Sequence, residues 1–430
     1  MKKNKFITST IILVIGGFIT KILGMIIKIF MTRLVGTEGI GLYMLINPTF
    51  VLFISICTLG LPTAISKLIS ENRKNNKKLV FSSVFIAVCI NIFIMFFIIL
   101  FAKTIAINLL HDIRTYYPVL SIGLVLPFIS ISSILRGYFF GKQKCIPHVL
   151  SNILEDITRL ISIILFVPFF LKKGIEFAVC FLVLSNIISE LTSIFIFLLF
   201  LPKKFKITKD DIKPSKDNIK DILGISLPST GSRLIGSIGL FFEPIILTYF
   251  LTKMGYSNNF IVTEYGILNG YVMPLILLPS FFTGAISQVL LPIVSQHHSK
   301  KNYKYVKNKI KQAIFYSLLI GIPVTIIFIT IPQIPLKLIY NTNEGINYIK
   351  FLSIICLLHY IQSPLTSSLH AMNKSKEAMK GTLGGMILRT ISLIIFCLLD
   401  LKLWSLVFAS SINIIYVTIH HIIVVIKELK

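Results

Sequence analysis

The sequence predicts an all-α integral membrane protein with about twelve transmembrane helices in two six-helix lobes. Three observations predict this class: apolar runs along the whole chain, basic residues concentrated in alternate loops, and a likeness between the two halves. Of the 430 residues, 55% are hydrophobic and 14% are charged, whereas soluble domains carry about 25% charged residues. The composition therefore excludes a soluble multidomain protein.

Twelve apolar runs are long enough to cross a membrane, because about 20 helical residues span the hydrocarbon core of a bilayer. They cover residues 8–31, 42–65, 79–101, 117–140, 148–171, 176–201, 222–250, 266–294, 313–335, 346–371, 381–400 and 403–426. Strands of a membrane β-barrel would alternate polar and apolar residues. Stretches such as 90–100 are apolar on every face, so we expect helices.

The basic residues fall mainly in alternate loops. The chain has 43 Lys and Arg against 17 Asp and Glu, a formal net charge of +26. When the loops are assigned in turn to two sides, 28 basic residues share the side of the N-terminus, nine lie opposite and six lie within the spans. Basic loops face the cytoplasm, so we expect both termini there and a multi-pass protein of the cytoplasmic membrane. No nucleic-acid partner is needed to explain the charge.

The two halves of the chain resemble each other. Residues 59–85 and 289–317 each contain a span that ends in Leu-Pro, a basic amphipathic stretch and a further span, with Pro62 matching Pro292. Arg159 similarly matches Arg389. We expect an N-terminal lobe over 1–201, a cytoplasmic linker over 202–221 and a C-terminal lobe over 222–430. Transporters built from such repeats bind their substrate at the repeat interface.

Charged residues within the spans form the candidate site, because a charge in the bilayer centre costs roughly 2.5–3.5 kcal/mol and usually faces a cavity or a partner. The first span carries Lys21 and Lys28, seven residues apart and so on one helical face, with Arg33 near its outer end. The seventh span carries Arg233. These four basic residues are the expected substrate-binding set.

Acidic residues within the spans have two interpretations that the sequence leaves open. Glu155 and Arg159 are four residues apart, close enough to pair on one helical face. They form a structural pair, or they belong to an ion-coupling site. The full set of candidates for these two roles is Glu155, Asp156, Arg159, Glu190 and Glu243.

Signatures of enzymes, cofactors and metals do not stand out, so we expect neither catalysis nor a cofactor. Gly137-x3-Gly141-Lys142 has the wrong spacing for a phosphate-binding loop. His297 and His298 have no glutamate at the spacing of a zinc site. The six cysteines are scattered and form no CxxC pair, so no metal site is expected.

Three stretches carry a family resemblance. They are residues 20–43 (TKILGMIIKIFMTRLVGTEGIGLY), 135–160 (LRGYFFGKQKCIPHVLSNILEDITRL) and 265–296 (YGILNGYVMPLILLPSFFTGAISQVLLPIVSQ). They resemble the polysaccharide-biosynthesis branch of the MOP exporter superfamily, in particular its stage V sporulation protein B-like members. This branch is related to the lipid II flippases and the MATE exporters. The resemblance covers almost the whole chain.

The resemblance implies a V-shaped pair of lobes whose central cavity opens alternately to each side of the membrane. It implies a polyprenyl-diphosphate-linked sugar as substrate, for cell-wall, spore-cortex or polysaccharide synthesis, and a wall or polysaccharide polymerase as a partner. Lys21 and Arg33 match motif positions for the headgroup, while Arg136, Glu155 and Arg159 match positions with a structural role. Na⁺ coupling, H⁺ coupling and the membrane potential stay open as energy sources.

Lipid II itself is not specified by the resemblance. The lipid II flippases carry further arginines on the second and eighth helices, and the corresponding stretches here, around 49–50 and Asn269, have none. A cation-coupled multidrug exporter of the MATE type is the alternative, with the acidic residues carrying the cation. An integral-membrane glycosyl- or acyltransferase is the third hypothesis, but no reactive histidine or acidic pair stands out on a loop.

Overall fold

The computed structural model describes residues 2–71, 75–201 and 208–429, and within these ranges it contains helices and no strand. The chain divides into two compact units, Met1–Pro244 and Ile245–Lys430. The predicted linker lies partly at 202–207, outside the described residues, so the predicted division into lobes at that linker stays a prediction.

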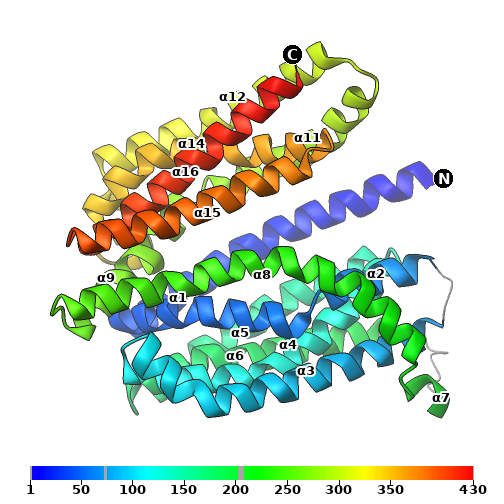
Figure 1. Cartoon of the computed structure of the whole chain (residues 1–430), viewed down its shortest axis with the longest axis horizontal. Coiled ribbons are helices and arrows are strands. Elements are labelled where there is room, and N and C mark those ends of the chain that lie inside the picture. The colour runs from blue at the N-terminus through cyan, green and yellow to red at the C-terminus, as the bar shows by residue number, and fades with distance from the viewer. Residues whose placement is uncertain (1, 72–74, 202–207, 430) are drawn as a thin grey trace. The chain divides into compact units, whose positions relative to one another are not determined.

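The described residues of unit 1 form eight α-helices, the last of which continues into unit 2 (Figure 1). They are α1 (Lys2–Thr58), α2 (Leu61–Glu71), α3 (Asn76–Thr104), α4 (Tyr116–Gly141), α5 (Cys145–Leu171), α6 (Ile175–Leu199), α7 (Lys209–Ile212) and α8 (Lys216–Lys253). The short helices η1 (Ile105–Leu109) and η2 (Ile113–Thr115) join α3 to α4. Helices α4, α5 and α6 pack side by side.

Unit 2 holds the end of α8 and the remaining helices. They are α9 (Asn258–Gly266), η3 (Ile267–Val272), α10 (Met273–Ile276), α11 (Ser280–Ser299), α12 (Tyr303–Thr330), α13 (Gln333–Tyr340), α14 (Ile346–Ala371), α15 (Ser375–Leu398) and α16 (Trp404–Glu428). Helices α14, α15 and α16 pack together, as α4, α5 and α6 do in unit 1.

The prediction of an all-α multi-pass membrane protein is confirmed. Nine helices of the described residues are long and apolar enough to cross a membrane, or ten if the bent pair Asn258–Ile276 and Ser280–Ser299 is one span. Two differences explain why ten helices are counted within the described ranges and not the twelve predicted spans. Helix α1 contains the first predicted span and most of the second, which are therefore counted together. Helix α5 carries the three charges of Glu155, Asp156 and Arg159, which make it too polar for that count.

Glycine and proline explain where the long helices bend. Helix α1 is kinked at Gly36, whose φ of 68° lies in the region that glycine adopts without a steric cost. The eighth predicted span, 266–294, is broken by 49° between Ile276 and Ser280. Pro279 lies in this break; proline lacks the N–H that a continuous helix needs.

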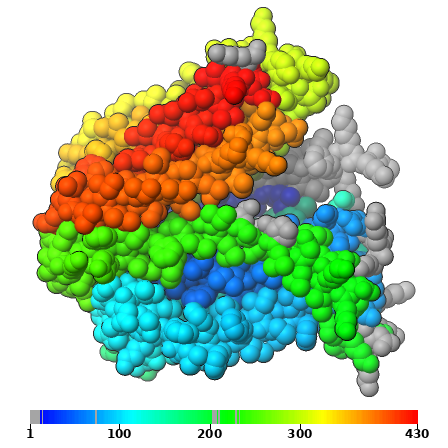
Figure 2. Space-filling view, viewed as in Figure 1, coloured from blue at the N-terminus to red at the C-terminus, as the bar shows by residue number. Residues whose placement is uncertain are grey.

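Apolar side chains of α3 are exposed along much of its length. Ile92, Phe93 and Phe96 are 60%, 67% and 60% exposed, and Figure 2 shows α3 in light blue on the visible surface. Soluble proteins rarely expose contiguous apolar surface on this scale. The exposed face of α3 is therefore a surface for lipid.

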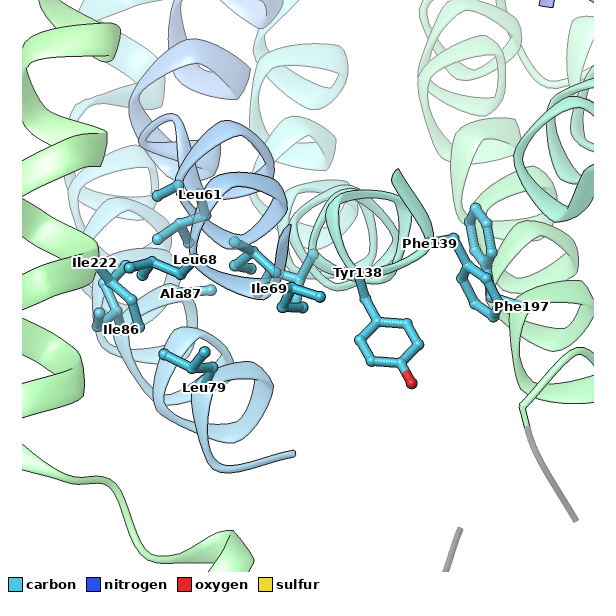
Figure 3. Close-up of a cluster of buried hydrophobic side chains, with 13 residues drawn as sticks. Leu61, Leu68, Ile69, Leu79, Ile86, Ala87, Tyr138, Phe139, Phe197 and Ile222 are labelled. Carbon is cyan, nitrogen blue, oxygen red and sulfur yellow. The ribbon is translucent and has the colours of Figure 1, made fainter. Parts of the chain in front are cut away.

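A hydrophobic core joins five helices at one end of unit 1 (Figure 3). Leu61 and Ile69 come from α2, and Leu79 comes from α3. Phe139 of α4 stacks on Phe197 of α6 with 5.3 Å between the ring centroids. Ile222 of α8 is fully buried in the same cluster. The first turns of α8 are therefore anchored in unit 1.

Close approach of α2 and α4 requires a glycine at position 137. A Cβ atom there would lie 2.7 Å from the carbonyl oxygen of Pro62 and 2.8 Å from its Cα. Backbone atoms of a packed helix do not yield easily, so we expect Gly137→Ala to destabilise unit 1 by about 1–3 kcal/mol. Thermal unfolding of the purified protein in detergent checks this.

Gly17→Ala is the matched control for that substitution. No atom lies within 4 Å of a Cβ at Gly17, and alanine favours helix over glycine by about 1 kcal/mol. We expect Gly17→Ala to melt at or above the temperature of the unchanged protein. A melting temperature of Gly137→Ala as high as that of the control would show that α2 and α4 are not in close contact.

Candidate functional site

A charged network connects α4, α5 and α6 inside unit 1. Glu155 of α5 accepts a hydrogen bond from Nη2 of Arg136 on α4 at 3.1 Å. It also accepts one from Nη2 of Arg159, one turn further along α5, at 3.5 Å. Arg159 in turn donates to the hydroxyl of Ser189 on α6 at 3.3 Å. One carboxylate therefore bridges two guanidinium groups from neighbouring helices.

The network is buried on its acidic side and more open on its basic side. The Glu155 side chain is 12% exposed, whereas those of Arg136 and Arg159 are 30% and 25% exposed. The Nε atoms of both arginines are buried and have no hydrogen-bond partner in the described part of the chain.

Glu190 of α6 and Asp156 of α5 lie in different surroundings. Glu190 is buried and accepts a hydrogen bond from the hydroxyl of Ser132 on α4. Asp156 is half-buried and forms no hydrogen bond or ion pair with the residues that the structure describes. The candidate acidic residues of α5 and α6 thus separate into a paired one, a hydroxyl-bonded one and one without such a contact.

The basic candidates of α1 lie along the first half of that helix. Lys21 and Arg33 are exposed and Lys28 is half-buried. Seven residues of helix separate Lys21 from Lys28 by about 10 Å, two turns along one face. The same half of α1 packs closely against α5. The closeness is seen at Gly16, where a Cβ would lie 2.3 Å from a methyl group of Val149.

The candidates on α8 lie at different depths. Arg233 is exposed, whereas Glu243 is 8% exposed. Helix α8 meets the second half of α1 through a 2.8 Å hydrogen bond between the hydroxyls of Ser55 and Ser237. Because Ser237 lies one turn from Arg233, Arg233 is close to this crossing of α8 and α1.

The corresponding helices of unit 2 carry a neutral network instead. At the offset that relates Arg159 to Arg389, Thr366 replaces Arg136 and Gly385 replaces Glu155. Thr366 contacts Nδ1 of His421 at 3.1 Å. Gln362 of α14 donates to the hydroxyl of Thr418 on α16 at 2.9 Å. At these matched positions, the described residues of unit 2 therefore have no carboxylate; the ion-paired carboxylate of Glu428 lies elsewhere in that unit, at the end of α16.

Sequence reasoning identified the charged residues of this site but not all of their partners. Ser132 lies in the stretch SISS at 130–133, and Ser189 directly precedes Glu190. Nothing in their spacing predicts a contact with an acid or a base on another helix. Arg136 contacts Glu155, and its structural role stays a prediction. The neutral network around Gln362 was also missed.

The fold and the intramembrane charges define a multi-pass membrane protein of the MATE and MOP type. An inward-facing multidrug resistance MATE family transporter of the MOP superfamily has the same fold, with a TM-score of 0.75 at 15% identity over 95% of this chain and 94% of that chain. The family described as polysaccharide biosynthesis protein matches residues 6–298. The chain belongs to this family, in its stage V sporulation protein B-like branch.

Two curated relatives illustrate this relationship. Stage V sporulation protein B of Bacillus subtilis is 36% identical over 401 residues, which cover 91% of this chain and 77% of that protein. Lipid II flippase MurJ of the same organism is 22% identical over 432 residues, which cover 90% of this chain and 76% of that protein. The predicted family is therefore confirmed.

Proposed function

We propose that this protein is an alternating-access flippase of the cytoplasmic membrane. Its substrate is a polyprenyl-diphosphate-linked oligosaccharide or a peptidoglycan precursor, used for cell-wall, spore-cortex or polysaccharide synthesis. The observation that carries the proposal is the set of basic side chains on α1, in a chain that is similar to a lipid II flippase. A wall or polysaccharide polymerase is the partner that would use the flipped lipid.

We assign the basic residues of α1 and α8 to binding the diphosphate group of the substrate. Lys21 and Arg33 are exposed and Lys28 is half-buried, so their charges are not all enclosed by packed helices. Attraction between opposite charges grows strongly as the dielectric constant falls, which favours a diphosphate beside cations within a membrane. Arg233 on α8 is assigned to the same set. We assign Arg136 and Arg159 a structural role and not a role in substrate binding, because Glu155 neutralises part of their charge.

The acidic residues support this assignment by what they contact. Glu155 forms ion pairs with two arginines, and Glu190 accepts a hydrogen bond from a serine hydroxyl. We propose a structural role for Glu155 and Arg159. Asp156 and Glu243 stay candidates for coupling to Na⁺ or H⁺, and the membrane potential is the third energy source.

The orientation is proposed from the charge asymmetry, with both termini and the linker 202–221 in the cytoplasm. In this orientation the basic loops meet the anionic headgroups of the inner leaflet. The substrate would enter from that side, where lipid-linked sugars are assembled from soluble precursors.

Reconstitution tests the function directly. The purified chain is placed in liposomes with a fluorescent polyprenyl-diphosphate sugar, and an impermeant quencher reports the fraction of lipid in the outer leaflet. We expect protein-dependent flipping of this lipid and none of a fluorescent phosphatidylcholine. Correctly folded protein that flips no polyprenyl-diphosphate sugar would overturn the proposal.

A cation-coupled multidrug exporter is the second candidate, favoured by the fold shared with a MATE transporter. It places the coupling ion at a buried acid such as Glu243. The four basic candidates argue against it, because they repel cationic drugs. Drug resistance on overexpression that disappears in Glu243→Gln would favour the exporter over the flippase.

A further inference from the structure

A groove in unit 2 lies between α11 and α12 and has a volume of about 420 Å³. Its α11 wall is apolar throughout, and its α12 wall is partly polar. The lining residues are Ala285, Ile286, Val289, Leu290 and Ile293 of α11, and Lys309, Gln312, Ala313 and Tyr316 of α12. Pockets for small ligands have volumes of about 300–1,000 Å³, so the groove has the size of a binding site.

The two walls run in opposite directions, since α11 and α12 are consecutive helices joined by the short turn at 300–302. Ile293 therefore lies across from Lys309, near the turn, and Ala285 lies across from Tyr316, further from it. Eight residues of helix make the groove about 12 Å long. Leu290 and Ala313 are each 4% exposed and form its floor, while Val289 is 60% exposed at its rim.

The polar side chains of the α12 wall hold one another in place. The ammonium group of Lys309 donates to Oε1 of Gln312 at 3.0 Å. Nε2 of Gln312 donates to the hydroxyl of Tyr316 at 3.0 Å. The same ammonium group lies 5.5 Å from the centre of the Tyr305 ring. The groove therefore has a hydrogen-bonded cation at its turn end, whereas an ordinary lipid-facing surface is apolar throughout.

The turn after α11 and the first half of α12 carry charge of one sign, and the acid nearest to this turn among the ion pairs of the described residues is Glu428 of α16, which contacts His298. The stretch 300–316 contains six lysines and no Asp or Glu. Lysines next to a membrane surface attract anionic headgroups. Because Lys309 is the one lysine of this stretch that lines the groove, it is the residue that links the basic surface to the apolar wall.

We propose that the α11–α12 groove binds a single anionic phospholipid of the surrounding bilayer. The phosphate contacts Lys309 and Gln312, and one acyl chain lies along Ile293, Val289 and Ala285. The lipid is a bound regulator or stabiliser and not the transported substrate. The site belongs to unit 2, whereas the basic residues assigned to the substrate belong to unit 1.

Native mass spectrometry of the full chain in detergent, with added phosphatidylglycerol or phosphatidylcholine, tests the site. We expect Lys309→Gln to weaken phosphatidylglycerol binding about fivefold, the contribution of one lysine beside an anionic headgroup. Binding of phosphatidylcholine should weaken less, because its choline group offsets the charge of its phosphate. Lys307→Gln is the matched control: Lys307 is an exposed lysine of the same helix that does not line the groove, and we expect it to bind phosphatidylglycerol like the unchanged protein.

A second variant tests the apolar wall. Val289→Trp places a large ring at an exposed rim position, where it does not disturb the core, and we expect it to weaken binding of both phospholipids. A phosphatidylglycerol with a photoreactive acyl chain should label peptides of α11 and α12 in the unchanged chain and not in Val289→Trp.

Three results would overturn the proposal. The first is an equal loss of phosphatidylglycerol binding in Lys309→Gln and Lys307→Gln, which would show attraction to the basic surface as a whole. The second is photolabelling of helices other than α11 and α12. The third is displacement of the bound lipid by a polyprenyl diphosphate at a lower concentration than by phosphatidylglycerol, which would make the groove a substrate-tail site.

Discussion

Glu155→Gln is expected to destabilise unit 1 more than other single substitutions of the candidate acids. Glutamine keeps the shape of the side chain but removes the negative charge that bridges Arg136 and Arg159. The two guanidinium groups then lose the carboxylate that both of them contact, although Asp156 and Glu190 still interact with them electrostatically. Removing one partner of a buried ion pair costs about 3–5 kcal/mol. Because these arginine side chains are 30% and 25% exposed, solvent screening places our expectation at the lower end, about 3 kcal/mol.

Asp156→Asn is the matched control. It changes the neighbouring acid of the same helix, which makes no ion pair with the described residues, so we expect a melting temperature close to that of the unchanged protein. Thermal unfolding and gel filtration in detergent measure both variants. The comparison separates loss of the bridge from loss of any negative charge on α5.

A double substitution tests the bridge itself. In Arg136→Gln with Glu155→Gln, the glutamate and one of the two arginines are removed together, so we expect the double variant to be more stable than the sum of the two single effects predicts. Additive effects would mean that Arg136 and Glu155 do not interact. A Glu155→Gln variant that is as stable as the unchanged protein but has lost transport would instead assign Glu155 to ion coupling.

Hydropathy predicts most of this fold because the membrane imposes one simple condition on each helix. A span such as α3 needs only a long apolar run, and residues 79–101 supply it. Breaks were harder to predict. The sequence placed one span over 42–65, but the structure ends α1 at Thr58 and begins α2 at Leu61, since Leu59 and Gly60 both have positive φ.

The candidate site was predictable only in part, because contacts within a helix follow from spacing and contacts between helices do not. The four-residue separation of Glu155 and Arg159 was enough to predict their pairing, and the structure shows it. The contact between Ser132 and Glu190 joins α4 to α6 across 58 residues. Its partners are set by how the helices pack, and one sequence without its structure holds no local signal for that.

The difference between the two units has a physical consequence for the proposed mechanism. Unit 1 holds its α4–α5–α6 group together with a charged bridge, while the matched positions of α14, α15 and α16 in unit 2 use amide, imidazole and hydroxyl groups. A charged bridge contributes stability only while all of its members are in place. We therefore expect unit 1 to be the more sensitive of the two to single substitutions at these positions.

Lys21→Ala is expected to have the largest effect on transport, about a tenfold decrease in the flipping rate. A hydrogen bond to a charged group contributes about 1.5–3 kcal/mol, and each 1.4 kcal/mol corresponds to a factor of ten. Lys21 is exposed on α1, so alanine there leaves no cavity in a packed core. The amount of membrane-inserted protein and its melting temperature should stay unchanged, and the liposome assay with a fluorescent polyprenyl-diphosphate sugar measures the rate.

Two further variants connect that loss to the charge and position of Lys21. Lys21→Arg keeps the positive charge and should retain most of the flipping. Lys103→Ala removes an exposed lysine from the last turn of α3, outside the proposed substrate set, and should flip at the normal rate. If Lys21→Ala flips as fast as Lys103→Ala, the lysine does not contact the diphosphate. If Lys21→Arg is as slow as Lys21→Ala, the side chain acts through its shape or its helix contacts. The proposed role of Lys21 requires the alanine variant to be slow and the arginine variant to be fast, because a diphosphate is bound by charge.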